Sequence, residues 1–443
     1  MHIISNNMMQ EKRESFVRKI AKIAENLHEP SVRGSRRTRF VAGEDAAFSL
    51  ANGALDLWDN IIKDLLIINR WNAKFSEKYL DKKLQEIMNK IIKDGDSRKA
   101  LEYFNQLVDD YEQYSKIHIL YLPLFGIEMV EKPIKLGNVV LKRMDDNSIE
   151  ELESRIEKTV NQSLNTDEEK QMFVEQENEN LNKFLRNKVC AIIEVTAEPD
   201  RALEIAETEA ERTIDLLRYA IPAIYSPSKN VAVGLQGEYS YQTRYTPIFA
   251  IDGKSFSCIN SVVGPLFPLE LSDTNVRHMR NIGVFTLGEI MEKKQPSKFE
   301  EELLKGIEWF SRAQTQSEPK NKLLNLITVL ETFLTPGQND PIQKSIAEGV
   351  AILLGKDAVG RKKIMKRIKE FYGARSKLSH GHSKEILDTD VRELSNIAGL
   401  LIMRLTELRN QFVSKNELIE WIEYVKLGGT PEQWDEYKKI LNN

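Results

Sequence analysis

The chain has 443 residues, of which 41% are hydrophobic and 29% are charged, and its formal net charge is −4. This length exceeds one ordinary hydrophobic core, so we expect a globular protein of two or three domains. A sequence pI of about 6.0 excludes a protein whose whole surface coats nucleic acid. The two cysteines, Cys190 and Cys258, exclude a disulfide framework and favour a reducing compartment.

The sequence also gives no sign of export or membrane insertion. The first residues lack the apolar core of a signal peptide. The longest uncharged apolar run near the end covers residues 397–403, whereas a membrane-spanning helix needs about 20 residues. We therefore expect a cytoplasmic protein without a membrane partner.

Residues 1–115 are predicted to form a helical N-terminal region. Apolar residues recur at helical spacing in "SFVRKIAKIAENL" and "LWDNIIKDLLIINRW". Between these stretches lies an arginine cluster made of Arg33, Arg36, Arg37 and Arg39. It has two interpretations, a phosphate-contacting loop or a surface loop whose arginines pair with carboxylates, and the second is favoured.

Residues 116–298 are predicted to form an α+β domain with a sensing or regulatory role. Short β-rich runs, "IHILYLPLFGIEMV" and "KLGNVVLKRM", are followed by a buried strand and a long helix that Pro222 should end. Three tyrosines, Tyr239, Tyr241 and Tyr245, could stack on bases, although packing on a sheet face is the preferred interpretation. Without a glycine-rich phosphate loop or dinucleotide fingerprint in the sequence, no cofactor is expected.

The middle region contains a strongly acidic segment. From Asp145 to Glu179 there are twelve acidic and three basic residues, a net charge of −9. This pattern indicates an exposed helix pair or a partly mobile segment. Such a surface could also cover a basic helix in a resting state.

Residues 299–443 are predicted to be entirely helical. The stretch "KNKLLNLITVLETFLTPG" is apolar nearly all round and should be the central helix. Asp390, with Glu393 three residues later, is predicted to cap the helix that follows. The apolar a/d spacing of that helix would serve either the bundle core or a partner. The fold class expected for the whole chain is therefore α+β.

A basic stretch lies inside this helical region. From Lys356 to Lys384 there are ten Lys or Arg residues and two acids, a net charge of +8 in an acidic protein. A local positive field of this size indicates a surface that meets a polyanion. The residues predicted to bind RNA phosphates are Lys362, Lys363, Lys366, Arg367 and Lys377.

Two residues in the basic stretch suit phosphodiester cleavage. His380 can give or take a proton near neutrality, and Arg375 stays charged with a planar fork that matches phosphate oxygens. Positions five apart on a helix are about 140° apart, so Arg375 and His380 cannot both lie along one face of a regular helix. They could meet if His380 lies at the helix end, with Gly381 just beyond it, or a second copy of the chain could complete the pair. The alternative makes Arg375 a surface arginine tied to Glu331 or Glu370, and His380 a helix cap.

A metal site is a weaker alternative. His380 and His382, with Asp388 and Asp390, form a conceivable ligand set. Alternate residues share a face only in an extended segment, and Asp390 is better explained as a cap. No metal is therefore expected.

The stretch "FYGARSKLSHG", with Arg-x4-His ending a basic helix, resembles the signature of the HEPN ribonucleases (higher eukaryotes and prokaryotes nucleotide-binding domain). It is most similar to the ApeA-like branch, with "ITVLETFL" and "IAEGVAILLG" upstream in the expected order. The resemblance covers roughly the last third of the chain. It implies an all-α HEPN-type bundle, a homodimer, and metal-independent RNA cleavage by paired Arg375 and His380. Glu331, Ser376 and His382 would support the site, and Ser376 matches the polar residue that often follows the family's arginine.

The resulting expectation is an RNA endonuclease that acts as a toxin or antiphage abortive-infection effector. Its N-terminal two thirds would respond to a phage-derived or cellular trigger. The alternative is a non-catalytic HEPN module that binds nucleotide, RNA or a protein partner.

Overall fold

The structure is a computed structural model of the 443-residue chain. It describes residues 2–25, 38–42, 47–51, 53–94, 99–113, 116–129, 132–163, 166–225, 231–237, 242–249, 256–263, 267–335, 342–379 and 386–441. The chain divides into two compact units. The first comprises Met1–Leu120 and Ile193–Thr208, and the second comprises Tyr121–Ile192 and Glu209–Asn443. Mixed helix and strand content confirms the α+β class.

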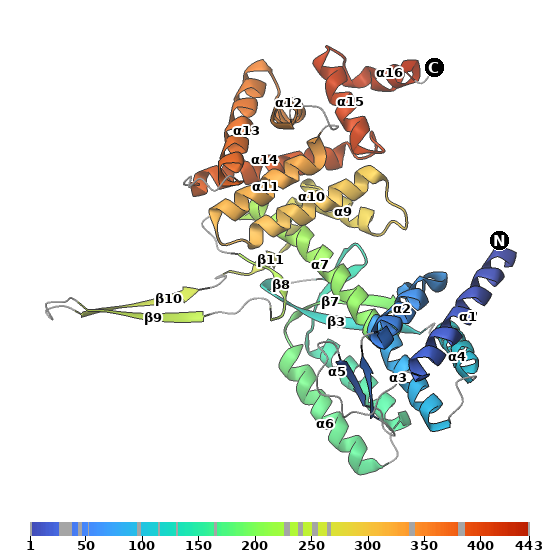
Figure 1. The fold of residues 1–443 in the computed structure, drawn as a ribbon. Helices are drawn as coiled ribbons and strands as arrows, with labels where there is room; N and C mark the ends of the chain where they lie inside the picture. Colours follow the sequence, from blue (N-terminus) through green and yellow to red (C-terminus); the bar gives the residue numbers. More distant parts are fainter. Residues whose placement is uncertain are drawn as a thin grey trace. The chain divides into compact units, whose positions relative to one another are not determined.

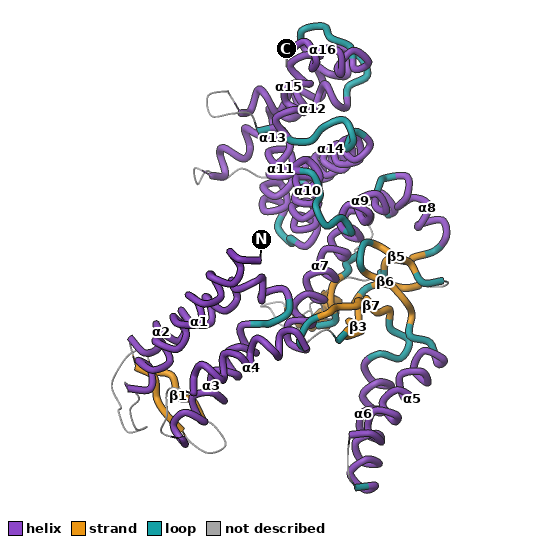
Figure 2. Tube along the Cα trace, turned by 90° about the vertical axis from the view of Figure 1, so that its right-hand side faces the viewer, coloured by secondary structure: helices purple, strands orange, loops and turns teal. Residues whose placement is uncertain are grey.

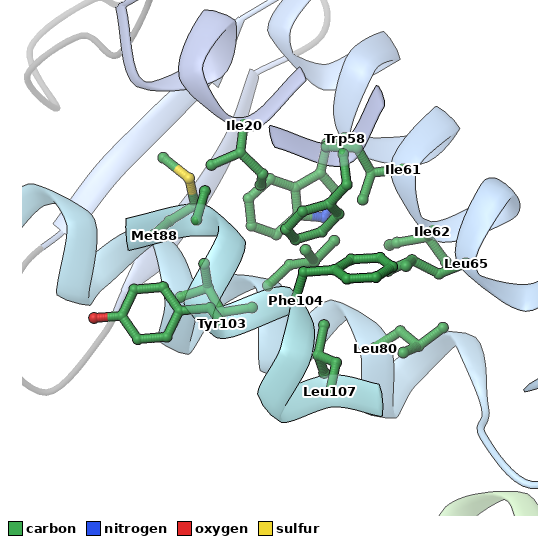
Figure 3. Close-up of a cluster of buried hydrophobic side chains, with 14 of the residues drawn as sticks. Ile20, Trp58, Ile61, Ile62, Leu65, Leu80, Met88, Tyr103, Phe104 and Leu107 are labelled. Carbon is green, nitrogen blue, oxygen red and sulfur yellow. The ribbon is translucent and has the colours of Figure 1, made fainter. Parts of the chain in front are cut away.

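The first unit is mainly helical, as predicted, and it surrounds an aromatic core. The core includes Trp58, Trp71, Phe75 and Phe104, all almost fully buried. The helices line this core because they repeat apolar residues every three or four positions, and Figure 3 shows Trp58 and Phe104 within it. A short β-hairpin interrupts the helices and was not predicted. The elements are α1(His2–Glu25), β1(Thr38–Ala42), β2(Ala47–Ala51), α2(Gly53–Ile67), η1(Ile68–Ala73), α3(Glu77–Asp94) and α4(Ala100–Gln113).

A small sheet occupies the middle of the chain, where short strands were expected (Figure 1). Its order is β5-β6-β7-β3-β8, and the pairs β5–β6, β6–β7 and β3–β8 are antiparallel. Buried Cys190 in β7 packs with Met144 and Ile149, and burial raises the pKa of its thiol to about 12. The strands are β3(Ile117–Phe125), β5(Ile134–Leu136), β6(Val139–Arg143), β7(Val189–Thr196) and β8(Gly234–Leu235).

Two further strand pairs lie outside this sheet. The pair β4(Ile127–Met129) and β11(Leu269–Leu271) is parallel, and the pair β9(Gln242–Phe249) and β10(Phe256–Val263) is an antiparallel hairpin. Tyr245 lies in β9, opposite Asn260, whereas Tyr239 and Tyr241 lie outside the described residues.

The acidic segment forms the predicted helix pair, α5(Asp146–Ser163) and α6(Asp167–Phe184), which lie side by side (Figure 2). Both helices are largely exposed. Asp146 of α5 binds Arg186, just after α6, and Asp167 binds Lys170 at 3.6 Å. Within the described residues, this segment therefore keeps most of its negative charge unbalanced.

The long helix α7(Pro199–Ile224) follows β7, as predicted, but Pro222 does not end it. The helix continues for two more residues, because proline near a C-terminus removes only one of the last backbone hydrogen bonds. At the start of α7, backbone amides of Asp200 and Arg201 donate to Glu198 at 2.9 and 2.7 Å. This carboxylate satisfies N–H groups that lack partners within the helix.

The C-terminal part is helical, which confirms the coarse prediction for this region (Figure 1). The a/d residues of α14, including Leu394, Leu401 and Leu405, are buried, so this face forms the bundle core rather than an open partner surface. No helix among the described residues is long and apolar enough to cross a membrane. The helices are α8(Asp273–Asn281), α9(Val284–Met291), α10(Lys298–Thr315), α11(Pro319–Leu334), α12(Ile342–Leu354), α13(Ala358–Ser379), α14(Asp388–Glu407), α15(Lys415–Lys426) and α16(Trp434–Leu441).

Helices α10 and α11 approach each other closely at Gly306. A Cβ placed on Gly306 would lie 2.1 Å from Cζ of the buried Phe333 ring. We expect Gly306→Ala to destabilise the protein, because overpacking costs about 1–3 kcal/mol and the alanine gains only about 1 kcal/mol of helix propensity.

Thermal and urea unfolding of the full chain would measure this effect. Gly373→Ala is the matched control, because Gly373 also lies within a helix and a Cβ there meets nothing within 4 Å. The control should be neutral or stabilising. Equal gains in stability from both substitutions would contradict the packing described for Gly306.

Candidate functional site

The candidate site lies where α11 meets α13. Glu331 occupies the last turn of α11, and buried Leu330 and Phe333 on either side of it fix that turn in the core. On α13, Ile368, Phe371 and Ala374 form the buried face. The apolar neighbours of Glu331 in the sequence therefore hold this residue at the border between the packed core and solvent.

Glu331 binds two side chains of α13, one with each carboxylate oxygen. Arg375 donates from Nη2 to Oε2 at 3.0 Å, which is the partner expected from the sequence. The hydroxyl of Tyr372 donates to Oε1. In addition, the Arg375 guanidinium carbon lies 5.3 Å from the centroid of the Tyr372 ring, within cation–π range.

The side chains of this site differ in their exposure to solvent. The side chain of Glu331 is 19% exposed and that of Arg375 is 35% exposed. Burial, followed by the hydrogen bond to Glu331, raises the pKa of Tyr372 to about 12, so its hydroxyl stays a donor at neutral pH. Arg375 is thus fixed from the core side and open to solvent on its other side, where it could bind a phosphate.

Arg367 differs from the other residues predicted to bind RNA. Its Nε donates to both oxygens of Glu393 at 2.9 and 3.0 Å, and Nη2 donates to Asp390 at 3.0 Å. It also binds Glu370 and lies over the ring of Phe371. These carboxylates, Glu393 foremost, hold the pKa of Arg367 above its usual value. Its charge is already balanced, which favours a structural role.

The same contacts correct the predicted helix cap. The cap residue of α14 is Leu387, without a side-chain hydrogen bond, and Asp390 lies inside the helix. Asp390 and Glu393 face Arg367 on α13 rather than the N-terminus of α14. Asp390 and Glu393 have the spacing of a capping box, but both carboxylates bind Arg367, which is distant in sequence.

The remaining lysines predicted to bind RNA are exposed. Lys362, Lys363, Lys366 and Lys377 all lie on the solvent side of α13. At about 100° per residue, Lys362 and Lys366 are rotated by about 140° and 180° from Arg375. Within one copy of the chain, these lysines therefore do not converge with Arg375 on a single phosphate.

The second half of the predicted catalytic pair, His380, lies outside the described residues, as does His382. The described part of α13 reaches Ser379, the residue before His380, so the position of the helix end stays a prediction. Ser376 is exposed, one residue after Arg375. Among the described residues, no group of histidine, cysteine and carboxylate side chains could hold a metal ion.

Sequence reasoning did not single out Tyr372. The signal was available, because Tyr372 precedes Arg375 by three residues and therefore lies one turn away on the same side of α13. The sequence does not show that the Tyr372 hydroxyl has a partner, because Glu331 lies on a different helix, α11.

Comparisons with known proteins returned no match to any family model, curated protein or solved structure. The class of site therefore rests on its own geometry, which is a carboxylate-anchored arginine at the edge of a helical bundle.

Proposed function

We propose that the chain is a metal-independent RNA endonuclease of the HEPN type. The observation that carries this proposal is the arrangement of Arg375, anchored to Glu331 at 3.0 Å yet 35% exposed, four residues before the end of α13. Anchoring orients a fixed positive charge, and the open side leaves it able to bind a phosphate oxygen. His380 follows Ser379 in the sequence and supplies the titratable group.

In the proposed reaction, the RNA 2′-hydroxyl attacks the adjacent phosphorus atom. The P–O2′ bond forms, the P–O5′ bond breaks, and a proton leaves the 2′-oxygen while another is delivered to the 5′-oxygen. His380 either accepts the proton of the 2′-hydroxyl or donates the proton to the 5′-oxygen. Arg375 stabilises the negative charge that develops on the phosphoryl oxygens. The products are a 2′,3′-cyclic phosphate and a 5′-hydroxyl.

The lysines of α13 have a different role in this proposal. Lys362, Lys363 and Lys366 are rotated away from Arg375 and are therefore assigned to attraction of the RNA backbone rather than to the scissile phosphate. Arg367 is assigned to the ion network that joins α13 to α14.

We also propose a homodimer, because one copy supplies only one Arg375 and one His380, whereas the proposed mechanism uses paired copies of both. The residues preceding α10 would sense a phage-derived or cellular trigger, and the protein would act in the cytoplasm as a toxin or antiphage effector. The exposed acidic pair α5 and α6 is consistent with such regulation.

Purified full-length protein should cleave RNA in EDTA, because the proposed groups need no divalent ion. The assay uses labelled mixed-sequence RNA under single-turnover conditions with protein in excess, so that a slow resting activity is still measured. Cleavage that disappears in EDTA and returns with a divalent ion would contradict the mechanism.

The alternative is a non-catalytic module that binds nucleotide, RNA or a protein partner. The pairing of Arg375 with Glu331 favours it, since a structural arginine would make the same contact. Saturable RNA binding without cleavage by the same preparation would support this alternative.

A further inference from the structure

We infer that Tyr372 is a positioning residue that sets the orientation of the Arg375 guanidinium through Glu331. This inference rests on the proposed function and assigns a role within the same site. Tyr372 does not touch the reacting atoms in this account. It acts on the arginine by two routes, a hydrogen bond to the shared carboxylate and a ring face beneath the guanidinium.

The two hydrogen bonds to Glu331 fix the plane of its carboxylate. Tyr372 occupies Oε1 and Arg375 occupies Oε2, so rotation of the carboxylate would break one bond or the other. A half-buried carboxylate at 19% exposure has little water to replace a lost partner, so both bonds are retained. The arginine therefore meets an acceptor whose direction is set by the tyrosine hydroxyl.

The ring of Tyr372 limits the guanidinium in a second direction. With its centroid 5.3 Å from the guanidinium carbon, the ring supports Arg375 on one side. Tyr372 and Arg375 are one helical turn apart, so both constraints come from a single rigid helix. Orientation matters because charge stabilisation of a transition state requires donors that are already in place before the reaction.

The hydroxyl stays protonated across the range in which a histidine titrates, because its pKa is raised to about 12. Its removal should therefore lower the rate without moving the pH profile. Tyr372→Phe removes the hydroxyl and keeps the ring, which separates the hydrogen bond from the ring contact.

The experiment measures single-turnover RNA cleavage by the full-length protein over about pH 5.5–7.5, about one unit on either side of the ordinary histidine pKa. We expect Tyr372→Phe to lower the maximal rate constant by about tenfold, while the half-saturating protein concentration changes less than about twofold. The pH profile should keep its midpoint. In a Glu331→Gln background, the same substitution should cost less than about twofold, because the hydroxyl acts through Glu331.

Tyr225→Phe is the matched control. Tyr225 is also half-buried, and its hydroxyl accepts a hydrogen bond from the backbone amide of Glu270 at 2.9 Å, on elements other than α11 and α13. This control should lower the melting temperature without changing the cleavage rate of the folded protein. A purely structural Tyr372 would behave in the same way.

The outcomes separate the two claims. A Tyr372→Phe protein that cleaves at the wild-type rate, or that loses an equal factor in the Glu331→Gln background, overturns the positioning role and leaves the proposed nuclease intact. A folded wild-type protein that binds RNA but does not cleave it overturns the proposed function, and the positioning role with it.

Discussion

Replacing Arg375 with alanine should reduce RNA cleavage by about a hundredfold to a thousandfold, the range seen when a transition-state donor is removed. Arg375→Lys should recover only part of the loss, because lysine keeps the charge but lacks the planar fork that binds Glu331 and a phosphate together. The measurement is the single-turnover rate constant at saturating protein. His380→Ala should give a loss of similar size.

The Arg375→Ala substitution also removes a partner from a half-buried carboxylate, so the fold must be checked separately. Leaving Glu331 with one partner fewer should cost about 1–3 kcal/mol of stability. A double variant, Arg375→Ala with Glu331→Gln, removes the unpaired charge and should recover much of that stability while staying inactive. An Arg375→Ala protein that is folded and cleaves within about threefold of wild type would refute the catalytic assignment.

Charge reversal of the lysine stripe on α13, made of Lys362, Lys363 and Lys366, should weaken RNA binding without changing the chemical step. In a variant with Lys362, Lys363 and Lys366 replaced by glutamate, the log–log dependence of affinity on salt should flatten by about 2, since each lost phosphate contact contributes about 0.7 on single strands. The half-saturating concentration should rise for every RNA sequence tested, because phosphate contacts carry no sequence information.

A matched control replaces three other exposed lysines, Lys294, Lys298 and Lys305, with glutamate. It changes the net charge equally but leaves α13 intact, so it separates a local effect from a global one. Fluorescence anisotropy at several salt concentrations gives the affinities and the slope. Equal effects from both triple variants, or a loss confined to one RNA sequence, would contradict a phosphate-attracting stripe on α13.

The sequence predicted this structure best where pattern and packing agree. The apolar stretch around Glu331 was expected to form a central helix, and α11 has that place, with Arg375 as the expected partner of the glutamate. The strand runs, the acidic helix pair and the helical C-terminal part follow the predicted periodicities as well. In each case the local signal and the buried surface point to the same element.

Predictions failed where a contact distant in sequence decides the outcome. Asp390 has the spacing of a cap but binds Arg367 from another helix. Tyr372 was not singled out because its place in the site depends on its hydrogen bond to Glu331 on α11. The assignment of Arg367 to RNA stays a prediction, although Asp390 and Glu393 of α14 already pair with this arginine. Periodicity describes the faces of one helix and does not indicate which helices meet.

The predicted boundary near residue 299 stays a prediction, but the packing shows what a truncation there would remove. Tyr219 of α7 packs edge-on against Phe310 at 5.5 Å and donates to the carbonyl oxygens of Ile282 and Gly399 at 3.1 and 3.3 Å. A fragment starting at α10 would lose these contacts. Tests of the site are therefore best made on the full chain.

The chemistry of the RNA ends tests the central claim most directly. Full-length protein in EDTA should leave 2′,3′-cyclic phosphate and 5′-hydroxyl ends, detected by end-specific ligation and sequencing, because the 2′-oxygen is the proposed nucleophile. DNA of the same sequence should stay intact, and Arg375→Ala and His380→Ala should yield far fewer such ends. Ends carrying a 5′-phosphate and a 3′-hydroxyl would contradict the account, since water rather than the 2′-hydroxyl would then be the nucleophile.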